Sequence, residues 1–365
     1  MNFKRHEITL MQYIFIIHGS QVGIGILQMP RMLAEKAGTD GWIAIGVSWL
    51  LSMAVSLLIV QIMAMYPQGT IIDLLDRVFG KWAAKTGALV IAAAFAFATM
   101  TVMFRAILFI KAFILPRTAD YMLFLLFAIP TYLILSKGVR VLGRYSELVF
   151  LILIWMPFFY LFAFPDFHWL YLLPVLKEGW MPVLKAVPDT VTSFDGFEIA
   201  FFLYPFLRKK ESASAGIVIA NTLTMLVYMG ITVICFVFFS PEGILDTNEP
   251  TLTILKVIEF HFLERLELIF LAFYLFVVST TWMPFLFWSA TAANRLFGIT
   301  HSNRTLIVLL LAMFVILLFH RPYFNENDRW QELYSRFIIG FAYVFPVCLW
   351  GYLRIRQMIL GRRPS

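Results

Sequence analysis

Long apolar segments alternate with short polar connections along almost the whole chain. A helix needs about 20 mostly apolar residues to cross the hydrocarbon core of a bilayer. The pattern predicts ten such spans, at residues 9–34, 41–65, 86–115, 119–136, 145–164, 183–207, 213–240, 266–294, 304–320 and 334–353. Little sequence is left over, so residues 1–365 are predicted to form a single polytopic transmembrane domain.

Polar and glycine residues interrupt two of these spans, at residues 20–25 in the first and at residues 193–196 in the sixth. The bilayer core offers no water to free N–H and C=O groups, so a broken helix is tolerated where its backbone lines a cavity. Interrupted helices at corresponding positions of two halves indicate a small-molecule site near the midplane. The alternative for the glycines alone is close helix packing, which small residues also permit.

The position of the two breaks divides the ten spans into five plus five. Because five is odd, the second set enters the membrane from the opposite side, which gives an inverted repeat of approximately residues 9–164 and 183–353. The predicted fold class is therefore an all-α integral membrane protein with ten transmembrane helices and discontinuous helices 1 and 6. This repeat rests on topology, because the two halves share no convincing residue identity.

Basic residues gather in every second loop and set the orientation. They include Lys4, Arg77, Lys137, Arg208 and Arg354. Cytoplasmic loops are enriched in Lys and Arg, so both termini are predicted to be cytoplasmic. This topogenic role also accounts for the pI of about 9.4, so the charge does not indicate a nucleic-acid partner.

Composition agrees with a membrane protein, since 61% of the residues are hydrophobic and 14% are charged. That surface would not keep a soluble domain in solution. Two amphipathic stretches, residues 70–85 and 251–265, are predicted to be surface-lying connectors on the cytoplasmic and outer faces.

The interrupted backbone predicts a particular ligand chemistry. The N–H end of a half-helix has partial positive charge and binds carboxylates, whereas the carbonyl end favours ammonium groups and small cations. Gly23 and Gly25 have no Cβ, so a ligand can approach the bare backbone there. A free amino acid carries both charges close together. We expect its carboxylate near Gly25 and its ammonium near the carbonyls before Gly23 and around Ser193.

Asp195 and Glu198 are the acidic residues in the middle of the sixth span. An intramembrane carboxylate is costly and by default suggests a functional site. These two are predicted to take part in ion or proton coupling, to bind an ammonium group, or to pair with His18 or Arg105. The alternative for Glu198 is a structural partner or contact with cytoplasmic water, and for Arg105 a structural salt bridge.

Three adjacent hydroxyls, Ser279, Thr280 and Thr281, lie at mid-depth in the eighth span. At least one should face the interior of the bundle, where it is able to help coordinate a cation with carbonyls of the first span. Hydrogen bonding between helices explains the cluster equally well.

The sequence contains no catalytic constellation. Its six histidines are scattered without metal-ligand spacing, and it has no Walker loop and no nucleophile motif with partners. We therefore expect no enzyme activity, no metal and no cofactor.

Several short motifs, in order, resemble one known family. They lie at residues 8–9 with Gln12, 23–27 with Pro30, 40–43, 66–67, 79–82, 172–175, 179–182, 194–198 and 205–207. In these segments the chain resembles the B subunit of GerA-type spore germinant receptors, which form the endospore germination permease family of the amino acid–polyamine–organocation transporter superfamily. The match runs from the N-terminus through the sixth span.

The resemblance implies a LeuT-like membrane subunit that senses a nutrient such as an amino acid and triggers spore germination. It would act with A and C subunits in the inner membrane of a spore, with both termini on the core side. The runner-up function is a proton-coupled amino acid permease. The ligand contacts of the superfamily carry over to Gly23, Ile24 and Gly25, to Ser193, Phe194 and Gly196, and, from spans three and eight, to Thr101, Tyr274 and Thr280.

Overall fold

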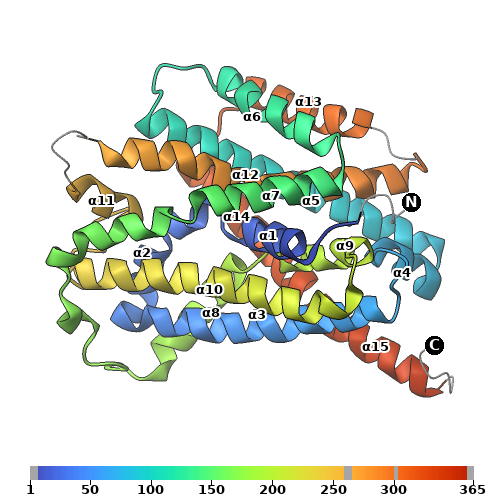
Figure 1. Ribbon diagram of the computed structural model, residues 1–365, viewed down its shortest axis with the longest axis horizontal. Helices are drawn as coiled ribbons and strands as arrows, with labels where there is room; N and C mark the ends of the chain where they lie inside the picture. Colours follow the sequence, from blue (N-terminus) through green and yellow to red (C-terminus); the bar gives the residue numbers. More distant parts are fainter. Residues whose placement is uncertain (1–6, 259–264, 300–302, 360–365) are drawn as a thin grey trace.

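The structure is a computed structural model that describes residues 7–258, 265–299 and 303–359. Long helices run roughly along one axis of the molecule, and shorter pieces connect them (Figure 1). Within these ranges the chain forms no β-strand, and a single isolated bridge pairs Ile8 with Leu207. The first helix begins and the last helix ends at the same end of the bundle (Figure 1), as an even number of spans requires.

The first predicted span is indeed broken. It consists of α1 (Leu10–Gln21), the 3₁₀ turn η2 (Ile24–Leu27) and α2 (Met29–Ala37). The helix begins at a capping box, in which Thr9 and Gln12 exchange hydrogen bonds of 3.1 and 3.2 Å between side chain and backbone. Pro30 lies in the first turn of α2, where its missing N–H costs nothing.

The sixth span is broken in the same manner. It consists of α8 (Trp180–Ser193), η6 (Phe197–Ile199), α9 (Ala200–Leu203) and η7 (Tyr204–Phe206). Gly196 lies in the break with φ of +114°, a conformation that residues with a Cβ rarely adopt.

Helices occupy the other eight predicted spans as well. They are α3 (Gly41–Ala64), α5 (Lys81–Phe113), α6 (Asp120–Leu135), α7 (Val139–Leu153) with η4 (Met156–Asp166), α10 (Ala213–Phe238), α12 (Leu266–Leu296), α13 (Asn303–Phe319) and the continuous run α14 (Phe324–Ile338), η9 (Ile339–Val344, a π-helix) and α15 (Phe345–Ile359). Short elements connect them: η3 (Gly38–Asp40), α4 (Ile71–Phe79), η5 (Trp169–Leu172), η8 (Lys210–Ser212) and α11 (Pro250–Val257).

Six of the helical stretches are long and apolar enough to cross a membrane by length and composition alone. The other four spans are the two broken ones and two short helices, α6 with 16 residues and α13 with 17. At a rise of about 1.5 Å per residue, each short helix covers roughly 24 Å, somewhat less than the hydrocarbon core. They pack against each other along one edge of the bundle (Figure 1).

Both predicted amphipathic connectors are shorter than expected. The helix predicted at 70–85 is observed as α4, which ends at Phe79. The next residue, Gly80, has φ of +86° and terminates the helix, and α5 begins at Lys81. The helix predicted at 251–265 is observed as α11, and residues 259–264 lie outside the described ranges. One face of α11 is buried, through Leu252, Ile254 and Leu255.

The core is built around α12, which packs most extensively against α5. All residues from Val278 to Ala290 are buried, so this half of α12 is enclosed by other helices. Aromatic rings fill the space between α5, α9 and α12, for example Phe95 against Phe202 and Phe285 at centroid distances of 5.9 and 5.2 Å. This rigid surround holds the two broken helices in contact at the centre.

Candidate functional site

The two helix breaks meet in the middle of the bundle. A Cβ added to Gly196 would lie 2.9 Å from the carbonyl carbon of Ser20 and 3.0 Å from the backbone nitrogen of Gln21. Only glycine allows this approach, so Gly196 brings the second break against the end of α1.

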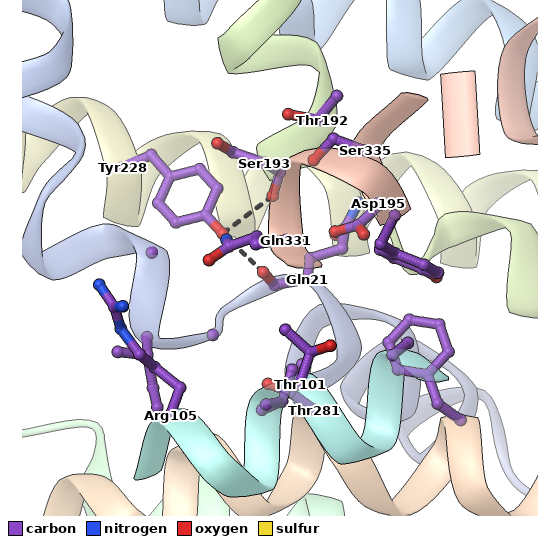
Figure 2. A pocket seen from close by; sticks show the side chains of 17 residues that line it. Gln21, Thr101, Arg105, Thr192, Ser193, Asp195, Tyr228, Thr281, Gln331 and Ser335 are labelled. Carbon is purple, nitrogen blue, oxygen red and sulfur yellow. Dashed lines mark hydrogen bonds between the residues drawn. The ribbon is translucent and has the colours of Figure 1, made fainter. Parts of the chain in front are cut away.

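Tyr228 of α10 ties the breaks together. Its hydroxyl lies 2.6 Å from the carbonyl oxygen of Gln21 and 2.9 Å from that of Ser193, the final carbonyls of the two half-helices α1 and α8 (Figure 2). Gln21 adds a second link, because its side-chain amide donates to the carbonyl of Phe194 at 2.9 Å. Helix-end carbonyls that have no intrahelical partner are thus satisfied by protein groups.

A cavity of about 100 Å³ with both polar and apolar lining lies where the breaks meet (Figure 2). Its lining combines both breaks with residues of α5, α10, α12 and α14. The lining residues are Gln21, Gly23, Ile24, Gly25, Ala98, Thr101, Val102, Arg105, Thr192, Ser193, Asp195, Tyr228, Thr281, Phe285, Gln331, Tyr334 and Ser335.

The structure brings about half of the sequence-predicted residues to this cavity. These are the three residues of the first break, Ser193 and Asp195 of the second, and Thr101 of α5. Gly23 and Gly25 leave room rather than pack closely, since a Cβ at either position would have no neighbour nearer than 3.5 Å. Of the two explanations for these glycines, the structure supports access to a cavity.

The remaining predicted residues of the sixth span lie behind the cavity wall. Phe194 is fully buried, with its ring edge-on to Tyr228, and Gly196 contacts α1. Glu198 bends back to accept from the N–H of Gly196 at 2.6 Å, and its other oxygen is buried without a partner among the described residues. Its observed role is therefore to cap the break.

The predicted residues of α12 hold the first break from its other side. The Tyr274 hydroxyl donates to the carbonyl of Gly23 at 2.7 Å, and Thr280 lies 3.4 Å from the carbonyl of Gly19. Thr281, which does line the cavity, lies within hydrogen-bond distance of the carbonyls of Gly19 and Val22, at 3.0 and 3.1 Å. These contacts match the alternative of hydrogen bonding between helices, and cation coordination stays a prediction.

The basic residue Arg105 and the acidic residue Asp195 lie on opposite sides of the cavity (Figure 2). Arg105 donates to Asp328 at 2.7 Å and to Gln28 at 3.0 Å, so it forms the structural salt bridge considered above. His18 bonds Thr224 at 2.9 Å. Within the described ranges, Asp195 therefore makes neither of the pairs considered for it.

Sequence reasoning missed the contribution of α10 and α14. Gln331, Tyr334 and Ser335 line the cavity from α14, and the Tyr334 hydroxyl is buried without a partner among the described residues. A signal was available, because Gln331 and Ser335 are four residues apart and share one helix face. On α10, Asn221, Thr224 and Tyr228 form a similar polar stripe facing α1.

Comparison with known proteins identifies the family. A family model described as a spore germination protein matches residues 7–328. The chain belongs to this spore germination protein family. Among curated relatives, spore germination protein GerQB of Bacillus cereus is 25% identical over 348 residues, covering 93% of both chains. Spore germination protein YndE of Bacillus subtilis is 25% identical over 338 residues, covering 88% of this chain and 89% of the relative.

A solved structure confirms the fold of this family member. A Na⁺-coupled sialic acid symporter, determined in a substrate-bound outward-open state, superimposes with a TM-score of 0.66 at 10% sequence identity. The match covers 92% of this chain and 77% of the symporter. The chain is thus an integral membrane protein with a LeuT-like fold, in which helices 1 and 6 are discontinuous. The curated relatives are named for spore germination.

Proposed function

We propose that this chain is the membrane subunit of a spore germinant receptor, and that it binds a small nutrient, an amino acid, in the cavity between helices 1 and 6. It would act with A and C subunits in the inner membrane of a spore, with both termini on the core side. The observation that carries the proposal is the cavity of about 100 Å³, lined by polar and apolar groups, at the meeting point of the two breaks.

The lining suits a zwitterion. The N–H groups of Ile24 and Gly25 open the turn η2, so their own helix offers them no acceptor, and both residues line the cavity. They are placed to bind the carboxylate of the ligand, with the positive charge of Arg105 nearby. The ammonium group would lie toward Ser193 and Asp195 on the other side.

The size of the cavity restricts the ligand. An ordered water needs about 10–15 Å³ on the same scale, so the cavity holds the equivalent of several waters. That matches an amino acid with a small side chain. Val102 and Phe285 supply an apolar surface for the side chain, and the unpartnered hydroxyl of Tyr334 is available to the ligand.

The second candidate is a proton-coupled amino acid permease that uses the same cavity. Asp195 lines the cavity, and Glu198 lies three residues further along the chain, behind the cavity wall. One Glu198 oxygen has no partner among the described residues. A pair of intramembrane carboxylates at a midplane site is the kind of group that relays protons in transporters.

Substitution at Gly25 tests the binding site. Gly25→Ala places a methyl group in the cavity without a clash, because its nearest neighbour is Gln331 at 3.9 Å. We expect at least a tenfold loss of affinity, about 1.4 kcal/mol, when the purified protein in lipid nanodiscs is titrated with each of the twenty amino acids. Gly46→Ala on α3 is the matched control. Its added Cβ would lie 3.8 Å from the side chain of Met229, and Gly46 does not line the cavity.

Two outcomes separate the candidates. A receptor subunit binds the amino acid and, in spores, Gly25→Ala abolishes the response to that amino acid while germination by other triggers remains. Accumulation of radiolabelled amino acid in vesicles containing this chain alone, lost when the proton gradient collapses, would establish the permease instead. Absence of binding by every amino acid would reject both.

A further inference from the structure

A second and larger cavity lies on the opposite side of the first helix break. This apolar crevice has a volume of about 350 Å³ and is bounded by α1, α7, η4, α10 and α12. Most of its surface is hydrocarbon or aromatic, for example Phe15, Phe150, Leu226, Ile231, Phe270 and Val277. The cavity where the two breaks meet (the solute cavity) and the crevice therefore share α1 and its break as a common wall.

The mouth of the crevice opens toward lipid. Figure 1 places α1 between α7 and α10, and both helices pack against it. Side chains at the mouth are more than half exposed, at 52% for Ile154, 61% for Phe158 and 57% for Leu226. Gly230 widens the opening, since a Cβ there would meet nothing within 4 Å. In a transmembrane bundle, what reaches such a mouth is the hydrocarbon of the bilayer.

The size and one buried hydroxyl specify the occupant further. An apolar cavity of about 150 Å³ binds benzene, so 350 Å³ accommodates roughly a dozen carbons, a long stretch of an acyl chain. Tyr160 lines the crevice, is 1% exposed, and its hydroxyl has no hydrogen-bond partner in the described part of the chain. A buried hydroxyl without a partner is costly, so an occupant that supplies an acceptor is favoured.

Hydrogen bonds connect the crevice to the solute cavity. His18 lines the crevice and lies 2.9 Å from the hydroxyl of Thr224, which donates to Gln21 at 2.7 Å, and Gln21 lines the solute cavity. Tyr274 makes a second link, because its ring lines the crevice while its hydroxyl holds the carbonyl of Gly23. An occupant of the crevice would therefore contact residues that are hydrogen-bonded to the break or to its neighbours.

We propose that an acyl chain of a bilayer lipid enters between α7 and α10, fills this crevice, and receives a hydrogen bond from Tyr160 at its ester oxygen. The bound chain supports the rear of the first break and thereby raises the affinity of the solute cavity. This coupling rests on the proposed function, whereas the lipid site stands without it.

Photocrosslinking tests the site. The native protein is placed in nanodiscs of phosphatidylglycerol that carries a diazirine in its acyl chain, and crosslinked peptides are mapped. We expect crosslinks to concentrate on the crevice faces of α7 and α10, and Gly230→Phe, which plugs the opening, to reduce them at least fivefold. Gly351→Phe on α15 is the matched control, since a Cβ there also meets nothing within 4 Å. Equal crosslinking in the two variants, or an even spread over all lipid-facing helices, would overturn the proposal.

A second variant tests the hydrogen bond from Tyr160 to the lipid ester oxygen without adding a bulky side chain. Tyr160→Phe keeps the ring and removes the hydroxyl. The native protein should retain ester-linked lipid about fivefold better than the ether-linked analogue, the equivalent of one hydrogen bond, and Tyr160→Phe should remove the difference. If free fatty acid of the same chain length displaces the probe and the two lipid linkages bind equally, the occupant is a fatty acid and the lipid assignment is wrong.

Amino acid titration of the same nanodiscs tests the coupling. Gly230→Phe should bind the amino acid several-fold more weakly than Gly351→Phe. If Gly230→Phe bound the amino acid with native affinity, the coupling would be rejected and the lipid site would be unaffected. A native protein that takes the acyl probe at the crevice but binds no amino acid would reject the proposed function and leave the lipid site intact.

Discussion

At the scale of single residues, the centre of the molecule depends on glycines that serve opposite purposes. Gly23 and Gly25 keep space open beside the backbone, whereas Gly196 removes a side chain where two backbones touch. The same residue type therefore maintains a cavity in one break and closes a contact in the other.

Gly196→Ala should be more damaging than another glycine substitution at positive φ. A left-handed conformation costs about 1–2 kcal/mol for a residue with a Cβ, and here the new Cβ would also press on Ser20 at 2.9 Å. Gly80 has φ of +86° with nothing within 4 Å, so Gly80→Ala isolates the conformational cost. We expect a loss of about 3 kcal/mol or more for Gly196→Ala, seen as a lower thermal unfolding midpoint. Equal midpoints for the two variants would contradict the backbone contact.

The residues that the sequence revealed are those that are unusual for their surroundings. Gly25 and Asp195 stand out in apolar spans, so their place in a cavity could be predicted. Tyr228 and Gln331 do not stand out in the same way, because a polar residue on a span faces either a partner or a cavity depending on how its helix is rotated. That rotation is set by tertiary packing.

At the scale of elements, α12 acts as a partner for the unpaired backbone of the first span. The hydroxyls of Tyr274, Thr280 and Thr281 lie beside carbonyls in the last turn of α1 or just beyond its end, those of Gly19, Val22 and Gly23. A broken helix in a membrane requires such partners, because lipid supplies none.

Thr281→Val should therefore destabilise the first break. Valine keeps the shape of threonine but leaves the carbonyls of Gly19 and Val22 without the hydroxyl, at a cost of about 1–3 kcal/mol. Thr291→Val on the same helix is the control, since its hydroxyl bonds a carbonyl of its own helix, that of Phe287 at 2.8 Å. Hydrogen exchange of residues 19–27 should rise in Thr281→Val alone, and unchanged exchange there would show that α12 does not hold the break.

The sequence predicted which helices form more accurately than where each helix begins and ends. The last span was expected at 334–353, yet its helix runs continuously from Phe324 to Ile359. Hydropathy excluded the first turns because they contain Glu326 and Asp328, and it could not indicate that Asp328 would be paired with Arg105. A rule based on apolar length cannot detect charged turns whose side chains find partners on neighbouring helices.

At the scale of the whole molecule, loop charge predicts the orientation in the membrane. The basic loops, the beginning of α1 and the end of α15 lie at one end of the bundle (Figure 1). The inverted repeat follows from the same count of spans, although the exact limits of its halves, residues 9–164 and 183–353, stay a prediction.

Cysteine labelling of intact cells should establish this orientation. With Cys235 and Cys348 replaced by alanine, Arg117→Cys lies in the exposed loop between α5 and α6 and should react with a membrane-impermeant maleimide. Lys137→Cys lies in the exposed loop between α6 and α7 and should react only after permeabilisation. The reverse pattern would place the termini outside.

The bridge between Ile8 and Leu207 has a mechanical consequence. The N–H of Ile8 donates to the carbonyl of Phe206 at 2.9 Å, and the N–H of Arg208 donates to the carbonyl of Ile8 at 3.1 Å. These bonds fasten the beginning of helix 1 to the end of helix 6. A tilt that opened a path at this end would have to swing both segments together or rupture both bonds.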